Sequence, residues 1–165
     1  MLRPSYLNAL VAVPPLTHEW YRLPVDAIRR AAAAICQTPE VSLTFLSVFS
    51  IQQEMGTGEV NLLPPEDLRL VMDIQEKKHR DSVAEYLKWF TERGIAHTIV
   101  IAQGAPDEVI VQKAEEMGAD LIIMGHHKKT SLFDIFSSDV AERVAKRAPC
   151  DVMIIAPGGG TRGKE

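Results

Sequence analysis

Five short apolar runs are the feature that most constrains what this chain can fold into. Each has the length of one strand, is rich in valine, isoleucine and leucine, and three of the five are followed directly by proline or glycine. The runs occupy residues 7–13, 41–49, 97–103, 120–125 and 151–156. Apolar residues at most positions indicate strands buried on both faces, which is typical of a parallel sheet.

Between these runs, four segments have the apolar period of an α-helix. They span residues 24–36, 66–93, 106–117 and 138–147. The apolar stripe of the longest one consists of Leu68, Val71, Met72, Val83, Tyr86, Leu87 and Phe90. Residues 51–65 show no steady period and contain two glycines and two prolines, so we expect a long loop there.

Strands that alternate with helices predict βαβ units with right-handed crossovers, and hence a doubly wound α/β open sandwich around a parallel sheet. In such sheets, ligands bind beyond the carboxyl ends of the strands, at the point where the strand order reverses. The loops that follow residues 13, 49, 103 and 125 are therefore the places to search for a site.

Length and composition indicate one globular domain. The chain has 165 residues, of which 46% are hydrophobic and 24% charged, as in folded, soluble proteins. We expect a single domain over residues 1–157 and a disordered, glycine-rich tail over residues 158–165. The net charge of −4, with no basic run longer than Lys128-Lys129, argues against a nucleic-acid surface.

Membrane insertion, secretion and metal binding have no support in the sequence. No apolar stretch approaches the roughly 18 residues that a bilayer span requires. The first apolar run is followed by Pro14-Pro15 rather than by a small-residue cleavage site, so we interpret it as a strand and expect a cytoplasmic protein. Cys36 and Cys150 have neither disulfide nor metal-ligand spacing, and we expect both to be small buried residues.

The C-terminal half resembles a known family. Residues 104–157 contain a Gly104–Asp107 turn, the strand DLIIMG after Gly118-Ala119, and the closing run RAPCDVMIIAP. In order and spacing these pieces are similar to the universal stress protein family, whereas the N-terminal half agrees with it in layout only. The resemblance implies a five-stranded parallel sheet of order 3-2-1-4-5. It also implies a small regulatory protein of the stress response, usually a homodimer, whose ATP-binding members hold nucleotide across the switch point.

The ATP-binding branch of that family has the motif G-x2-G-x9-G-[ST] after its fourth strand. The glycines let backbone N–H groups approach phosphate oxygens at the start of a helix. On this sequence the first glycine matches Gly125, but the second falls on Lys128, the third on Ser138 and the Ser/Thr on Asp139. The family's first-strand aspartate, which helps to hold the base, falls on Pro14. The resemblance therefore implies a degenerate nucleotide site.

Asp139 is the departure with the largest physical effect. A carboxylate in the first turn of a helix suits the helix dipole, but it repels a phosphate brought to the same N–H groups. Two like charges about 4 Å apart, in an effective dielectric near 20, cost on the order of 4 kcal/mol. We therefore expect no tight ATP binding in the family manner. Instead, Ser137 or Ser138 would cap the helix and Asp139 would complement its dipole.

A second interpretation keeps an anion site but builds it from side chains. Lys128 could donate to an anion, and protonated histidines beside it could add positive charge, so that the pocket takes an adenine nucleotide or a small anion. The other reading of this segment is a solvated basic loop on an acidic protein. The ligand-binding set under the hypothesis is Gly104, Gly125, His126, His127, Lys128, Ser137 and Ser138. No third ligand at a suitable spacing joins the histidines, so we expect no metal site.

Two further segments flank the predicted crevice. Residues 15–23 include Trp20 and Tyr21 and look like an insertion relative to the family. One of these aromatic side chains could stack on a base or close the crevice; otherwise they fill a surface groove. Residues 51–65 start at the carboxyl end of a strand, which makes them a candidate lid.

Three classes of function stay open: a ligand-sensing regulatory module, a ligand-free dimer that acts through protein partners, and an enzyme such as an ATP hydrolase. We favour a regulatory homodimer with a degenerate nucleotide site and no cofactor. Its interface is expected at the fifth strand, residues 151–156, because an apolar sheet edge is protected by pairing with a second copy. An enzyme is the weakest hypothesis, since the sequence contains no recognisable nucleophile–base pair, paired carboxylates or metal-ligand cluster.

Overall fold

The computed structural model describes residues 6–14, 22–35, 39–125 and 138–155. The elements are β1 (Asn8–Val13), α1 (Arg22–Ile35), β2 (Ser42–Phe49), α2 (Ile51–Met55), α3 (Thr57–Leu62), α4 (Pro65–Tyr86), α5 (Lys88–Glu92), β3 (Thr98–Gln103), α6 (Pro106–Glu116), β4 (Leu121–Gly125), α7 (Ser138–Arg147) and β5 (Asp151–Ile155). The strands form one sheet of order β3-β2-β1-β4-β5, in which every neighbouring pair is parallel. The predicted fold class and strand order are confirmed.

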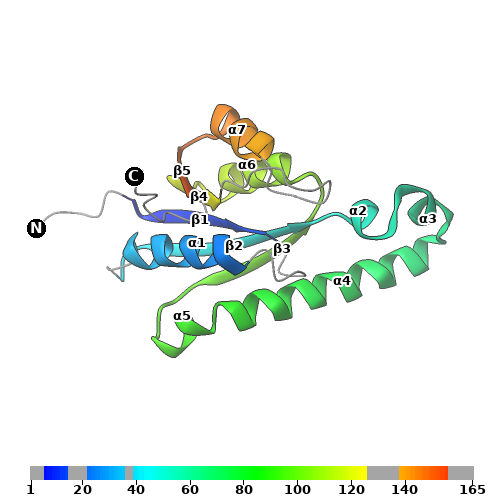
Figure 1. The fold of residues 1–165 in the computed structure, drawn as a ribbon, viewed down its shortest axis with the longest axis horizontal. Helices are drawn as coiled ribbons and strands as arrows, with labels where there is room; N and C mark the ends of the chain where they lie inside the picture. The colour runs from blue at the N-terminus through cyan, green and yellow to red at the C-terminus, as the bar shows by residue number, and fades with distance from the viewer. Residues whose placement is uncertain (1–5, 15–21, 36–38, 126–137, 156–165) are drawn as a thin grey trace, which may run out of the picture.

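Helices cover both faces of the sheet (Figure 1). α1 and α4 lie on one face and α6 and α7 on the other, as right-handed crossovers require. β1, β2 and β4 are buried along nearly their whole length, whereas β3 and β5 are partly exposed. The expectation that all strands are buried on both faces is therefore wrong for the two edge strands, which lie at the margin of the helical layers.

The predicted loop over residues 51–65 is wrong: most of this segment is helical. α2 and α3 are short helices separated by Gly56, whose φ of +90° interrupts the helical backbone. Each helix is fixed by one buried apolar side chain, Ile51 in α2 and Val60 in α3. Helices this short are not stable alone, so tertiary packing forms them and the sequence contains no full helical period to reveal them.

The predicted helix over residues 66–93 is divided into α4 and α5 at Leu87. Its inward stripe is otherwise as expected, with Val83, Leu87 and Phe90 buried in the core that the sheet shares with α1. α4 has 22 residues, so it is longer than the strands on which it packs. Its N-terminal half continues past the sheet, together with α2 and α3 (Figure 1).

A network of hydrogen bonds closes the amino end of the sheet. The carboxylate of Asp120 accepts from the backbone N–H groups of Leu7 (2.7 Å) and Asn8 (3.0 Å). The Asn8 side-chain amide in turn donates to the carbonyl of Met117 (2.6 Å) at the end of α6. Because these contacts join the start of β1 to the approach to β4, they hold together the two central strands that define the switch point.

We predict that Asp120→Ala lowers the free energy of unfolding by about 2 kcal/mol, because two backbone donors lose a charged acceptor. Urea denaturation measures the change. Glu115→Ala is the matched control, since the Glu115 carboxylate is exposed and forms no hydrogen bond to any other described residue. Equal stability of the two variants would contradict the role given to Asp120.

Candidate functional site

The carboxyl ends of β1 and β4 form the switch point of the sheet. β1 pairs with β2 on one side and with β4 on the other, so the strand order reverses there. Val13 ends β1 and Gly125 ends β4, and both are buried. Pro14 follows β1 directly and is also buried. It offers neither a carboxylate nor an N–H group to a ligand at this point.

Gly125 is packed closely from one side. A Cβ atom built on it would lie 3.2 Å from Cδ1 of Ile28, on α1. That contact is tighter than ordinary van der Waals packing, so a side chain at this position would displace the end of the Ile28 side chain by a few tenths of an ångström. The first glycine of the motif thus has a packing role here, whether or not a phosphate approaches it.

Gly104 follows the edge strand β3, which β2 and β1 separate from β4. At about 4.8 Å per strand, it lies roughly 14 Å to the side of Gly125, and it is also three residues further along the strand direction, because Gly125 is level with Ile101. Its φ of +147° and a Cβ position 2.9 Å from Cγ2 of Val109 both require glycine. Its N–H donates to the carbonyl of Phe49 (3.0 Å). A ligand that touched both glycines would therefore have to cross three strand spacings.

α7 begins at Ser138, so Asp139 is the second residue of that helix. This is where the motif alignment places the start of the helix. The remaining predicted residues, His126, His127, Lys128 and Ser137, lie outside the described residues, as do Trp20, Tyr21, Cys36 and the tail over residues 158–165. Their roles stay predictions.

Ion pairs fix α7 against α6. Asp107, in the first turn of α6, lies 3.3 Å from Nε of Arg143 and 3.6 Å from Nη1 of Arg147. The Asp107 side chain is largely buried, so solvent screens these pairs less than it screens pairs on the open surface. The contact holds α7 in place beside the sheet and thereby helps to set where its N-terminus lies.

A groove of about 480 Å³ lies between α4 and the carboxyl ends of β2 and β3. We call it the α4 groove. Its lining residues are Phe49, Pro65, Leu68, Arg69, Met72, Asp73, Glu76, Ile101 and Gln103. The sequence identified this end of the strands as a place to search, but it did not identify the residues of α4 that line the groove, because no local pattern shows where that helix packs on the sheet.

His79 is a buried polar residue that the sequence analysis missed. Its side chain is 1% exposed, its Nε2 lies 2.8 Å from Oε1 of Glu54 in α2, and its ring stacks on Phe49 at 5.0 Å. Among the described residues, Nδ1 of His79 has no hydrogen-bond partner. The residue thus holds α2 against α4. Its position seven residues after Met72 and four before Val83 places it on the apolar stripe, which was the available signal.

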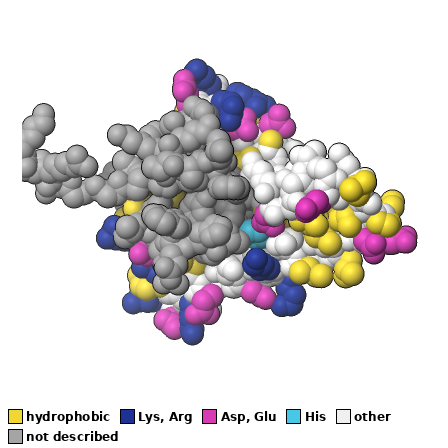
Figure 2. Space-filling view, turned by 45° about the vertical axis from the view of Figure 1, so that its right-hand side comes forward, with side chains coloured by type: hydrophobic (Ala, Val, Ile, Leu, Met, Phe, Trp, Pro, Cys, Tyr) yellow, Lys and Arg dark blue, Asp and Glu magenta, His cyan; other side chains and the backbone are white. Residues whose placement is uncertain are grey.

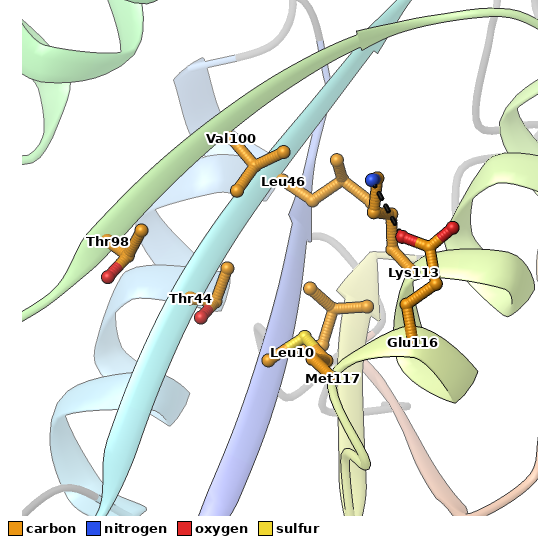
Figure 3. Close-up of a pocket in the computed structure, with 8 residues that line it drawn as sticks. All are labelled: Leu10, Thr44, Leu46, Thr98, Val100, Lys113, Glu116 and Met117. Atoms are coloured by element: carbon orange, nitrogen blue, oxygen red, sulfur yellow. Dashed lines mark hydrogen bonds and ion pairs between the residues drawn. The ribbon is translucent and has the colours of Figure 1, made fainter.

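A smaller hollow of about 250 Å³ lies on the opposite face of the sheet (Figure 3). Leu10, Leu46 and Val100 form an apolar floor, and the wall includes α6. The charged groups of that wall, Lys113 and Glu116, pair with each other at 2.8 Å. With its charges neutralised internally and a volume below that of typical ligand pockets, the hollow offers little to recognise a ligand.

The reactive groups of the described residues have the following environments. The described residues contain no group of three residues able to hold a metal ion. Cys150 is partly buried, and this burial raises the pKa of its thiol, which disfavours the thiolate. Burial and a hydrogen bond to Asp26 (2.7 Å) raise the pKa of Tyr86, so its phenol stays protonated and donates a hydrogen bond from α4 to α1.

No described helix is long and apolar enough to cross a membrane.

Comparison with known proteins gives the family. A model of the universal stress protein family matches residues 24–156, which is more than half of the chain. The chain belongs to the universal stress protein family. Universal stress protein MJ0531 of Methanocaldococcus jannaschii is 34% identical over 86 residues, which are 52% of this chain and 51% of the relative. The match thus spans about half the length of that curated relative.

Solved structures of the family share the fold. The structure of protein MJ0577, from the same archaeon, has a TM-score of 0.64 and 22% identity, and the alignment covers 91% of this chain and 96% of that one. A family member from Arabidopsis thaliana, solved with AMP bound, has a TM-score of 0.57 and 22% identity, with 92% of each chain covered. At this identity the likeness establishes the fold alone.

We predict that Gly104→Ala lowers the free energy of unfolding by about 1–3 kcal/mol, because it combines an unfavourable φ with a 2.9 Å contact to Val109. Gly125→Ala should cost less, because its φ lies outside the left-handed region and the end of the Ile28 side chain can shift. Urea denaturation measures both.

Gly58→Ala is the matched control, because nothing lies within 4 Å of a Cβ built there and the residue is within α3. It should leave stability unchanged or raise it slightly, since alanine favours helix by about 1 kcal/mol over glycine. A Gly104→Ala variant as stable as Gly58→Ala would show that the turn after β3 relaxes freely.

Proposed function

We propose that this chain is a regulatory homodimer of the universal stress protein type, whose degenerate nucleotide site does not hold ATP tightly in the usual family manner. The observation behind the proposal is the combination of one retained motif glycine, Gly125, with an acidic residue, Asp139, in the first turn of α7. We also propose that it is a cytoplasmic protein and not an enzyme.

The physical argument concerns which anion the start of α7 accepts. The first N–H groups of a helix attract negative charge, and a phosphate is the guest in family members that bind ATP. Here the chain provides its own carboxylate at the second helical residue, Asp139. Lys128, where the family has its second glycine, replaces a close backbone approach with a long side chain. Because Gly125 also packs closely against Ile28, its retention is not by itself support for ATP binding.

We predict that magnesium ATP leaves the melting temperature of the wild-type chain unchanged. The variant Lys128→Gly/Asp139→Ser should gain ATP affinity on the order of a hundredfold. The substitution at Asp139 removes a repulsion between carboxylate and phosphate of about 4 kcal/mol, and only part of this free energy appears as binding. A true ligand at a hundredfold excess over its Kd stabilises by about 2.7 kcal/mol, so thermal shift resolves the difference.

Lys129→Gly/Asp134→Ser is the matched control, since it makes the same two substitutions at nearby positions where the motif specifies no residue. It should gain nothing. ADP, AMP, cyclic dinucleotides and inorganic phosphate complete the ligand panel, and AMP is included because a family structure contains it. Tight ATP binding by the wild-type chain would refute the degenerate site. A shift with AMP or phosphate alone would instead favour a site rebuilt from His126, His127 and Lys128.

The homodimer part of the proposal is supported by β5. This strand lies at one edge of the sheet, so no strand of the described residues pairs with its outer backbone groups. Its side chains are mainly apolar, and Ile154 is 40% exposed. A second copy that pairs along this edge would satisfy the backbone groups and bury these side chains together.

We predict that Ile154→Asp reduces the mass of the assembly by a factor of two at micromolar concentration, because it places a charge on the paired edge. Size-exclusion chromatography with light scattering measures the mass. Leu62→Asp is the control, since Leu62 is 84% exposed at the end of α3, which does not contact β5. A monomeric wild-type chain would remove the homodimer from the proposal.

A further inference from the structure

α2 and α3 form a small unit that is attached to the rest of the molecule at few points. They pack mainly on each other, and they stand beyond the carboxyl end of the sheet, beside the start of α4 (Figure 1). From Ile51 to Leu62, only Ile51 and Val60 are buried. Figure 2, which brings this end forward, shows hydrophobic side chains at its surface, where few neighbours cover them. A unit that buries so little apolar area opens at a lower free-energy cost than the core does.

The two ends of this unit border the α4 groove. Phe49 precedes the unit and Pro65 follows it, and both residues line the groove. Ser50 (φ −127°, ψ 116°) and Leu63 (φ −76°, ψ 134°) flank the unit in extended conformation, so their backbones can rotate without interrupting a helix. The carbonyl of Phe49 accepts from the N–H of Gly104 (3.0 Å), which fixes the end of β2 when the unit moves. The unit is thus placed and connected as a lid would be.

One buried polar contact holds this unit to α4. Oε1 of Glu54 lies 2.8 Å from Nε2 of His79, whose side chain is 1% exposed. Nδ1 of His79 is buried and has no partner among the described residues, so a proton there would be a buried donor without an acceptor. The network therefore assigns the ring proton to Nε2, which donates to Glu54. If Glu54 were removed while the unit stayed in place, this buried N–H would be unpaired, which is costly.

The contact between Glu54 and His79 adjoins the α4 groove. The ring of His79 stacks on Phe49, with 5.0 Å between the ring centroids, and Phe49 lines the groove. Gln103, which also lines the groove, donates to Gln52 of α2 at 3.4 Å, but this hydrogen bond is long and exposed and contributes little. Among the described residues, Glu54 thus supplies the main polar tie between the unit and the groove.

We propose that residues 51–62 are a lid at the end of the α4 groove and that the contact between Glu54 and His79 is its latch. In the shut state, which the structure shows, the latch pairs Nε2 of His79 and keeps the ring out of contact with water. In the open state, α2 and α3 move away from α4 while the sheet stays intact. Nε2 of His79 is then free to donate to water or to a molecule in the groove. The groove thereby has a shut and an open form without unfolding of the domain.

Amide hydrogen exchange, measured by mass spectrometry at neutral pH, tests whether the lid opens separately. Amides of α2 and α3 should exchange while those of β1 and β4 are still protected. Val144→Ala is the control for global unfolding, because it truncates a fully buried side chain of α7 on the opposite face of the sheet. It should speed exchange in the sheet but leave α2 and α3 unchanged. Equal acceleration of both would mean that residues 51–62 open only with the whole domain, which would overturn the lid.

Substitutions at position 54 test the latch by the same measurement. Glu54→Ala should speed exchange in α2 and α3 about tenfold, because Nε2 of His79 loses its acceptor in the shut state. Glu54→Gln keeps an oxygen that accepts from Nε2 and should retain most of the protection. Glu59→Ala is the matched control, since this exposed carboxylate of α3 forms no hydrogen bond to another described residue. A Glu54→Ala variant that exchanges no faster than Glu59→Ala would refute the latch.

Met55 reports the same opening through its side chain. It follows Glu54 in α2, is half-buried and packs against the core. In dilute hydrogen peroxide, its oxidation to the sulfoxide should be about twofold faster or more in Glu54→Ala than in the wild-type chain, because the open lid exposes the sulfur. Met117, half-buried on the opposite face of the sheet, is the internal control and should react at an unchanged rate. Peptide mass spectrometry measures both. Acceleration at both methionines, or at neither, would contradict the proposal.

Discussion

The fold depends on one constraint: a parallel sheet must be covered by helices on both faces. Each strand can reach its parallel neighbour only through a crossover, and the right-handed crossovers place α1 and α4 on one face and α6 and α7 on the other. The same connections bring all carboxyl ends to one edge of the sheet. Because the chain moves outward from β1 to β3 and then crosses to β4, the switch point lies between Val13 and Gly125. The candidate site follows from this path before any side chain is considered.

Much of this could be predicted from the sequence, because burial on both faces leaves a strong signal. The apolar runs predicted every strand, and the stripe through Val83 and Phe90 predicted the packed side of α4. The segment over residues 51–65 could not be predicted, because α2 and α3 are held by single buried residues and by the contact of Glu54 with His79. Such long-range contacts produce no local period. The edge strands were misjudged for a related reason, since an apolar run does not show whether a helix covers it.

The candidate site was only partly accessible to sequence reasoning. The motif alignment located Gly125 and the start of α7, but it attributed the glycine to phosphate binding alone. The structure adds a packing reason, the approach of Ile28, and an equivalent one for Gly104 in its contact with Val109. Side-chain packing at glycines depends on residues far away in the sequence, so no motif reveals it. Consequently a retained glycine is weak support for a ligand, and the charge at Asp139 is the stronger argument.

The two edges of the sheet are protected differently, and this difference favours β5 as the proposed edge for self-association. On β3, Nη1 of Arg80 donates to the carbonyl of Ile99 (3.2 Å), so α4 places a charged side chain against the outer backbone of that strand. Charged cover of this kind discourages the addition of a further strand. β5 has one charged residue, Asp151, at its start, and the residues after it are apolar. A second copy therefore gains more from β5 than from β3.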